Sequence, residues 1–553
     1  MLYTHLEIVS AIIIPVEFVH DYLGKKFIYV RRMTDASESG LGDRHWITFS
    51  DDINSTFNNP SEYQYLACSF RIVSWNLLGD SPSLSLSPKH DYCPMEFRVW
   101  HDPAEKSHIA SRLDRTAAKL LELNTDIFCL QECLPSMFED LKSHPIIKGR
   151  FTCFHMKDYL VHTLDDLIMN DHDITELKVR STSKSSRDFD CAVFLSHSFM
   201  NQFKLCSVKS GTFKEFAPKV PSSAASKISG KARKRLLTLD SDGFLMLRLV
   251  SNACKDVEIT LVCTHLYWNP NEPHVKALQA ELLSHLAHIF SGGQKLPDLS
   301  ANASLEMNKQ LDVTKNHNAR PSTLHPKSRF ILIGGDLNSV PNFQPQFLAT
   351  DEERHMLCAS YQENGVQIDE PKHSTVKIDI AKLPLHKQQS AVFRLLLNGM
   401  LESDHPEHPD KFGRITSIKV PSKRIKVCGP LYCSPFVDNK VITYKMTHAF
   451  PRHLFEDASN TTHAEESFKF WPEYTNKVSD FEGTLDYILW CDSIKETKFC
   501  EGGECFIEKD MSAKIIQVGV LDIPSVGKAI PDHENTSDHL PVGAVFRIWR
   551  KTT

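Results

Sequence analysis

From Phe70 onward the chain alternates apolar runs of strand length with helical patterns, and this alternation limits the folds that it can adopt. "FRIVSWNLL" is followed by "SRLDRTAAKLLELN", where apolar or small residues recur at helical spacing, and then by "TDIFCLQE". Later runs of strand length are "DCAVFLS", "FLMLRLV", "EITLVCTHL", "RFILIGGDL", "TLDYILW" and "GAVFRIW", and a long helical pattern covers "PHVKALQAELLSHLAHIF". The pattern predicts an α/β domain over residues 68–550, built as a sandwich of two sheets flanked by helices.

Four polar or unmatched stretches lie outside this pattern. Residues 1–67 are predicted to form an N-terminal extension of unknown role that is partly β, and residues 32–63 within it are rich in turn-forming residues. Residues 171–190, 209–235 and 291–328 are predicted to be inserted surface loops. The basic insertion 209–235 suits a solvated loop best, and contact with RNA and a nuclear signal stay open as alternatives.

Composition restricts the class of protein and of partner. Hydrophobic residues make up 41% of the 553 residues and charged residues 24%, which is enough for a large globular core. The net charge of −6 gives no overall attraction for nucleic acid, so a phosphate-bearing substrate must be bound by a local patch or by cations. No internal repeat is present, and in particular no leucine-rich repeat.

The cysteines and the N-terminus indicate the compartment. The 15 cysteines form no C-x-x-C pair and no zinc-binding tetrad, and they lie in apolar contexts typical of buried thiols in a reducing compartment. The N-terminus lacks the features of a signal peptide, and no run of about 18 apolar residues suggests a membrane span. We therefore expect no membrane contact and an intracellular protein, in the cytoplasm first, with nucleus and mitochondrion left open.

Polar residues stand where the predicted strands end, and a loop at such a position can present them to a shared face. They are Asn76, Glu132, His265, Asp336, Asn338, Asp486, Asp538 and His539. Carboxylates and an amide oxygen are hard ligands that suit Mg²⁺ or Mn²⁺, and histidines near a phosphate can stabilise charge that develops on it. A glycine-rich phosphate loop is absent. The set predicts metal-assisted hydrolysis of phosphodiesters with one or two ions.

Six short motifs stand in the order found in a known superfamily. "WNLL", "LQE", "THLYWNP", "GGDLNS", "LDYILW" and "SDHLP" resemble the endonuclease/exonuclease/phosphatase superfamily, which has the DNase-I-like fold. The resemblance covers residues 68–550 apart from the insertions. "THLYWNP" with Lys276 and Gln279 after it, and Phe481 five residues before Asp486, is similar to the deadenylase branch. That branch comprises the carbon-catabolite-repressor catalytic subunits, nocturnin, the angel proteins and the 2′-phosphodiesterases. Trp75 departs from the tyrosine that relatives commonly have.

The resemblance implies a role for each matching residue. Glu132 corresponds to the principal Mg²⁺ ligand, with Asn76 and Asp538 beside it. The residues implied to act on the phosphate and the attacking water are Asp336, Asn338, His265, and His539 with its partner Asp486. The residues implied to bind substrate are Pro270 and Phe481, which would enclose an adenine base, and Lys276 and Gln279.

The resemblance also implies the activity and the partner. It predicts a Mg²⁺-dependent 3′-exoribonuclease that shortens poly(A) tails in mRNA decay and releases 5′-AMP, with RNA as its partner. A 2′,5′-oligoadenylate phosphodiesterase and a nocturnin-like dinucleotide phosphatase are alternatives with the same centre. A catalytically dead RNA-binding scaffold is the alternative of a different class. Protein partners are unknown, and without leucine-rich repeats the chain lacks that means of binding an adaptor.

Overall fold

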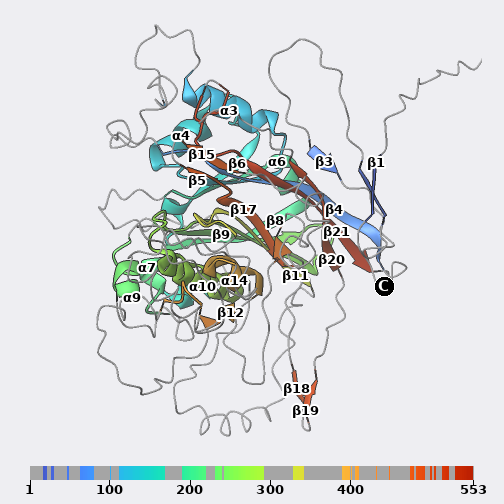
Figure 1. Ribbon diagram of the computed structural model, residues 1–553. Helices are drawn as coiled ribbons and strands as arrows, with labels where there is room; N and C mark the ends of the chain where they lie inside the picture. The colour runs from blue at the N-terminus through green and yellow to red at the C-terminus, as the bar shows by residue number, and fades with distance from the viewer. Residues whose placement is uncertain are drawn as a thin grey trace, which may run out of the picture.

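The computed structural model in Figure 1 places two β-sheets in the middle of the protein, with helices on their outer faces. It describes residues 17–20, 26–29, 46–48, 63–79, 100, 111–168, 190–219, 231–239, 242–291, 328–341, 389–398, 400–401, 405–409, 431–432, 447–448, 474–478, 481–491, 498–500, 503–505, 513–521, 530–532 and 534–551. The predicted insertions 171–190 and 291–328 therefore lie outside the described residues, apart from residues 190, 291 and 328.

The first sheet has seven strands and brings together strands from the two ends of the predicted domain. Its order is β3 (Trp46–Thr48), β20 (Ala513–Leu521), β21 (Val542–Lys551), β4 (Tyr63–Asn76), β5 (Ile127–Gln131), β7 (Ala192–Ser196) and β6 (Phe151–His155). Strands β4 and β5 are parallel, and β21 pairs antiparallel with β4 from Val542 opposite Ser74. This pairing brings the "SDH" motif, which precedes β21, next to the "WN" motif at the end of β4.

The second sheet has six strands and aligns three of the polar strand ends. Its order is β14 (Thr447–His448), β17 (Asp486–Cys491), β11 (Ser328–Asp336), β10 (Val257–His265), β9 (Gly243–Ser251) and β8 (Phe203–Thr212). Parallel pairing of β10 with β11 sets His265 opposite Asp336, and antiparallel pairing of β11 with β17 sets Asp336 opposite Asp486. The three residues therefore form one row across the sheet.

The strands read as continuous apolar runs because both faces of each sheet are buried. Side chains alternate between the faces of a strand. Ile72 and Leu261 thus point into the core between the sheets, whereas their neighbours Val73 and Val262 pack against helices. The outer face of the seven-stranded sheet is covered by α3 (Arg112–Glu122) and α4 (Pro135–Ser143), and that of the six-stranded sheet by α10 (Pro273–Phe290) and α14 (Ala391–Asn398). The predicted two-sheet sandwich flanked by helices is confirmed.

The remaining described elements are short. They are η4 (Met156–Asp158), α5 (Leu164–Ile168), α6 (His197–Gln202), α7 (Phe213–Phe216) and α9 (Lys231–Leu236), and the ribbons β1 (Glu17–His20) with β2 (Lys26–Tyr29), β12 (Met400–Leu401) with β13 (Leu431–Tyr432), β15 (Asn476–Val478) with β16 (Phe481–Gly483), and β18 (Lys498–Cys500) with β19 (Gly503–Cys505). Among the described residues, no helix combines the length and apolar character needed to cross a membrane.

Two predicted boundaries need correction. The predicted loop 209–235 begins inside strand β8, and its other described parts form α7 and α9. Phe213 and Phe216 are fully buried in the core beneath α10, so this stretch gains structure from long-range packing that local polarity conceals. Strand β4 begins at Tyr63, ahead of the predicted domain start at residue 68, and β3 of the N-terminal extension pairs with β20.

The two sheets approach each other closely at Gly334. A Cβ added there would lie 2.9 Å from both Cβ and Sγ of Cys129 on the facing sheet. We expect Gly334→Ala to lower the free energy of unfolding by about 1–3 kcal/mol, because overpacking forces neighbours out of position. Urea unfolding should show a lower midpoint with an unchanged slope. Gly79→Ala is the control, since its added Cβ would come no closer than 3.4 Å to another atom. An equal loss in both variants would contradict the prediction.

Candidate active site

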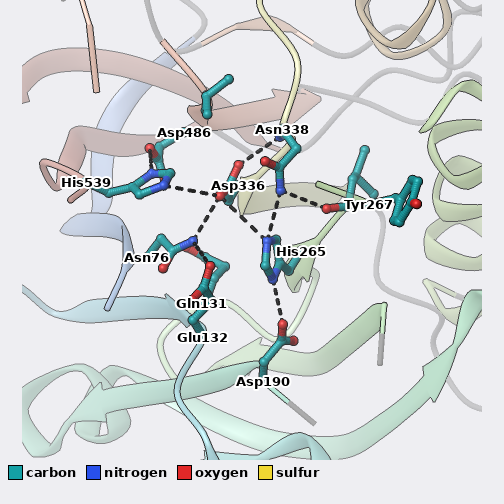
Figure 2. A network of polar contacts seen from close by, with 12 residues as sticks. Asn76, Gln131, Glu132, Asp190, His265, Tyr267, Asp336, Asn338, Asp486 and His539 are labelled. Carbon is teal, nitrogen blue, oxygen red and sulfur yellow. Dashed lines mark hydrogen bonds and ion pairs between the residues drawn. The ribbon is translucent and has the colours of Figure 1, made fainter. Parts of the chain in front are cut away.

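The polar residues predicted from the strand ends meet at one end of the two stacked sheets. The six-stranded sheet contributes the row His265, Asp336 and Asp486, and the seven-stranded sheet contributes residues at the ends of β4 and β5 and before β21. Figure 2 shows the two groups facing each other, with Asp336 in the middle. Residues more than 400 positions apart in the chain are therefore neighbours here, as in the hydrogen bond of 3.0 Å from the Trp75 indole to the carbonyl of His539.

Three residues of this centre have an uncommon backbone conformation. Leu78, Glu132 and Asn338 have positive φ angles of 60°, 52° and 46°, and Asn124 is the other described non-glycine residue with this property. For residues with a Cβ, this left-handed region costs about 1–3 kcal/mol, so it persists where the surroundings enforce it. The turn of the chain directly after each strand aims these residues back at the centre.

Asn76 joins two carboxylates. Its Nδ2 donates to Glu132 Oε1 at 3.0 Å and to Asp336 Oδ2 at 3.0 Å, while its own oxygen accepts from the Leu78 N–H at 3.0 Å. Glu132 Oε2 accepts from the Gly79 N–H at 2.8 Å. Burial acts to raise the pKa of Glu132, but the charge on His265 and these hydrogen bonds outweigh it and lower the pKa. Asn76, predicted as a ligand, here presents its amide nitrogen to the carboxylates.

Asp336 lies between two Asp–His pairs of the same design. Asp486 Oδ2 is 2.7 Å from His539 Nδ1, and Asp190 Oδ2 is 2.5 Å from His265 Nδ1. The Nε2 atoms of both rings are 3.7 Å from Asp336 Oδ2. A carboxylate on Nδ1 fixes the orientation of an imidazole, so both rings turn Nε2 toward the centre. Figure 2 shows the two pairs on opposite sides of Asp336.

The carboxylates favour the charged form of both rings. Burial alone would lower the pKa of His539, but Asp486, Asp336 and Asp538 raise it to about 10. Burial likewise opposes the charge on His265, and Asp190 leads the groups that raise its pKa well above the ordinary value. A protonated ring can donate a hydrogen bond from Nε2 to a phosphate oxygen and stabilise negative charge that develops there.

The pKa of His539 predicts a pH dependence of stability in the metal-free protein. Because the folded-state pKa of about 10 lies above the ordinary 6.5, this ring's contribution is complete below pH 6.5 and is lost as the pH rises toward 10. With EDTA present, we expect the free energy of unfolding to fall over that interval more steeply in the wild type than in His539→Asn. Urea titrations across this pH range measure the difference. Parallel curves for the two proteins would contradict the prediction.

The donor set fits a hard divalent cation. Ligand atoms of Asp336, Asp486 and His539 lie within 4.8 Å of one another, and all three residues are buried. No described residue donates a hydrogen bond to Asp486 Oδ1, although this oxygen is buried. An unpartnered buried carboxylate oxygen is costly, and a cation would relieve that cost. Oxygen-rich sets suit Mg²⁺ or Mn²⁺, so Asp336 and Asp486 would hold the metal together with the predicted ligand Glu132, which Asn76 joins to Asp336.

The other predicted metal ligand, Asp538, stands beside this set. It is partly exposed, and its carboxylate lies 3.4 Å from Ser537 Oγ. It contributes to the raised pKa of His539, which places its charge close to the centre. Its role as a ligand stays a prediction.

The four predicted substrate-binding residues differ in their burial and in how much of them the structure describes. Lys276 and Gln279 are buried in α10, which is covered along its length. Lys276 Nζ donates to the carbonyl of Asn338, and Gln279 accepts from the Tyr267 N–H at 2.8 Å, so both hold loops of the centre in place. Their contact with substrate stays a prediction. Pro270 is partly exposed at the rim, and Phe481 opens strand β16, with its side chain outside the described residues.

Sequence reasoning missed Asp190, which holds His265. The signal was present, because Asp190 directly precedes the apolar run of β7, just as Asp486 opens the apolar run of β17. Asn338 was identified, and its amide Nδ2 is 2.8 Å from the carbonyl of Leu266 and 2.9 Å from His265 Nε2. The loop after β11 thereby contacts the loop after β10.

Comparisons with known proteins were made for sequence and for structure. No protein-family profile matches the chain. Carbon catabolite repressor protein 4 homolog 4 of Arabidopsis thaliana is 35% identical over 80 residues, which is 14% of this chain and 16% of that protein. The crystal structure of ANGEL2, described as a 2′,3′-cyclic phosphatase, is 18% identical with a TM-score of 0.41 and covers 92% of this chain and 99% of its own. The human Nocturnin catalytic domain is 12% identical with a TM-score of 0.33 and covers 88% of this chain and 95% of its own.

The fold class and the cluster of polar side chains can now be stated together. The chain is an α/β sandwich of two mixed sheets, with carboxylates and paired imidazoles gathered at one end. The sequence match to the Arabidopsis carbon catabolite repressor homologue, which covers 80 residues, agrees with the predicted resemblance to the deadenylase branch of the endonuclease/exonuclease/phosphatase superfamily. That match spans about a sixth of the relative, so the activity of the whole relative is a matter for proposal.

Proposed function

We propose that the protein is a divalent-metal-dependent hydrolase of phosphoesters in nucleic acids or nucleotides. The finer proposal is a Mg²⁺-dependent 3′-exoribonuclease that shortens poly(A) tails and releases 5′-AMP. The observation that carries the proposal is the position of Asp336, which lies between the pairs Asp190–His265 and Asp486–His539 and is joined through Asn76 to Glu132. The resemblance of six ordered motifs supports the substrate class.

The side chains of the centre have three proposed roles: metal binding, contact with the phosphate and orientation of the attacking water. Glu132, Asp336 and Asp486 would hold the metal, which when bound neutralises phosphate charge and lowers the pKa of an attacking water. His265 and His539 donate from Nε2 to phosphate oxygens, and their carboxylate partners keep the rings oriented and charged. Asn338 and Asp336 orient the water, since the Asn338 N–H donates to Asp336 Oδ1 at 2.7 Å and fixes that carboxylate.

We propose that residues at the rim of the site select adenosine. Pro270 and Phe481 would enclose an adenine base, and stacking on an aromatic ring is worth about 1–3 kcal/mol for any base. Phe481 therefore supports nucleotide binding in general more strongly than adenine in particular. Action on mRNA tails also implies an intracellular location, which we place first in the cytoplasm.

The test is a time course with Mg²⁺ on a 5′-labelled RNA that ends in an adenosine tract. Wild type and Glu132→Gln are compared, since Gln keeps the shape of the side chain and removes its charge. Parallel substrates are a matched RNA ending in uridines, a 2′,5′-linked oligoadenylate, a dinucleotide phosphate and an RNA with a 2′,3′-cyclic phosphate end. A metal-dependent 3′ ladder on the adenosine tract, absent in Glu132→Gln, is the expected result. Hydrolysis of another substrate alone would overturn the finer proposal, and hydrolysis of none would overturn both.

The rival class is a catalytically dead RNA-binding scaffold. A catalytically competent centre binds metal in the folded state only, so saturating Mg²⁺ or Mn²⁺ should raise the melting temperature of the protein. At a hundredfold excess over Kd the gain in free energy of unfolding is about 2.7 kcal/mol. Glu132→Gln should reduce the gain. Absence of any metal-dependent shift, together with RNA binding that persists in EDTA, would favour the scaffold.

A further inference from the structure

An exposed tryptophan lies at the edge of the centre. Trp268 is 63% exposed, and among the described residues Tyr65 and Leu66 are the other large hydrophobic side chains that are exposed. It comes three residues after His265, and the intervening Leu266 and Tyr267 are buried. Its backbone is anchored, because Asn338 donates to the Leu266 carbonyl and Gln279 accepts from the Tyr267 N–H. The segment that carries the indole is therefore held in place, three residues after the histidine proposed to bind phosphate.

A basic helix is attached to the same segment. Helix α9, "KARKRL", has four basic residues and no acidic one. Arg235 donates to the Tyr267 hydroxyl, its Nε is 3.1 Å from Glu272 Oε2, and its guanidinium carbon lies 5.2 Å from the centre of the Tyr267 ring. The rings of Tyr267 and Trp268 are 6.0 Å apart. Figure 1 shows α9 beside α10 on the outer side of the six-stranded sheet.

These contacts join the basic helix α9 to Tyr267, the residue directly before the exposed indole. Glu272 offsets the charge of Arg235, whereas Lys234, its neighbour in the helix, is exposed. The chain as a whole carries a net charge of −6, so attraction for a polyanion has to be local. An aromatic ring interleaved with cations matches the alternation of bases and phosphates in a single strand. An acidic peptide would use the cations and leave the indole in water.

We propose that Trp268 and the exposed side of α9, with Lys234, form a docking surface for single-stranded nucleic acid. This α9–Trp268 surface would bind the part of the strand that extends away from the nucleotide being cleaved. The inference rests on the proposed function, because it assigns a second contact to the same substrate. It also gives a role to the basic helix α9, which the centre does not use.

The test measures binding in the Glu132→Gln background, so that turnover does not interfere. Fluorescence anisotropy follows a labelled adenosine oligonucleotide at several salt concentrations. Trp268→Ala should weaken binding about 5- to 150-fold, and Trp268→Phe should retain most of it, because a stacking surface remains. Lys234→Gln should reduce the slope of log Kd against log salt by about 0.7, the value for one phosphate contact with a single strand.

A matched control comes from the other end of the same sheet. Lys204 is exposed at the start of β8, whereas the end of β8 pairs through Gly243 with His265. Glu258, at the level of Lys204, lies seven positions before His265 along β10, which is a distance of roughly 23 Å. Lys204→Gln should leave binding unchanged. The proposed surface would be overturned if Trp268→Ala bound the oligonucleotide as tightly as the Glu132→Gln parent protein. It would also be overturned if Lys204→Gln and Lys234→Gln lost affinity equally.

Two further experiments test the occupant of the surface and separate this proposal from the proposed function. Polyglutamate that competes with the oligonucleotide at equal charge concentration would overturn nucleic acid as the occupant. Hydrolysis is measured separately in the active protein, on the long oligonucleotide and on a dinucleotide. The loss in Trp268→Ala should be several-fold larger for the long substrate. Binding that depends on Trp268 without hydrolysis by wild type would overturn the proposed function alone, and hydrolysis without that dependence would overturn the surface alone.

Discussion

Asp336→Asn is expected to lower kcat for phosphoester hydrolysis by about 10²- to 10⁴-fold, the range for loss of a positioned acid–base group. The carboxylate is 1% exposed, accepts hydrogen bonds from Asn76 and Asn338, and lies 3.7 Å from both imidazoles, so its charge acts on every other member of the centre. Asparagine keeps the shape and removes this charge. Steady-state kinetics on the substrate found by the RNA time course measure the effect.

The control for Asp336→Asn is a buried carboxylate of the same strand pair. Glu258, near the start of β10, is also buried, and burial raises its pKa, but it stands at the opposite end of the strand from His265. Glu258→Gln should keep kcat within a few-fold. Asp336→Asn should also lose most of the stabilisation by Mg²⁺ or Mn²⁺ in thermal unfolding. A variant that keeps both wild-type kcat and the metal-dependent shift would contradict the assignment of Asp336.

Asp190→Asn is expected to lower kcat by about 10- to 100-fold, the range for removing a hydrogen-bond partner that orients a side chain of a metal site. Asp190 leads the groups that raise the pKa of His265 against the effect of burial, so the pKa should fall in the variant. NMR titration of the imidazole in the metal-free protein measures this directly. A purely structural role would change stability without moving the pKa.

The second Asp–His pair provides the comparison for Asp190→Asn. Asp486→Asn should act in the same way on His539, since Asp486 leads the groups that raise its pKa. If both variants lower kcat and each moves only the pKa of its own histidine, the two pairs act as parallel supports of one centre. Unchanged kcat in Asp190→Asn would show that His265 needs no carboxylate partner.

Local pattern was sufficient to predict the central strands of both sheets and most residues of the centre. Short apolar runs marked β4, β5, β10, β11, β17 and β21, because residues buried on both faces of a sheet leave a continuous signal in the sequence. Polar residues that interrupt such a run are conspicuous, which is why Glu132, Asp336 and His539 were identified. The structure brings these three to one place, with Asn76 and the Asp336 carboxylate as the links.

Local pattern was insufficient where a residue's contacts depend on what covers it. Lys276 and Gln279 were expected at the substrate, but their helix is buried along its length and their polar ends hold backbone groups. The stretch 209–235 looks like a loop by composition, yet Phe213 and Phe216 fill the core below α10 and the following basic helix is attached to Tyr267. Neither outcome follows from residues near in sequence, because the covering groups come from distant segments.

The sequence by itself determined the central strands of both sheets, although not β6, β8 and β20. It also showed that polar groups stand at the strand ends and that those groups suit a hard metal and a phosphate. Only the tertiary structure decided which groups meet. The register of β10, β11 and β17 sets His265, Asp336 and Asp486 in one row, although about 220 residues separate the first from the last. Strand pairing is set by long-range burial and hydrogen bonding, which local periodicity does not encode. For the same reason Asp190, one acidic residue before a strand, gained its role only when folding placed it against His265.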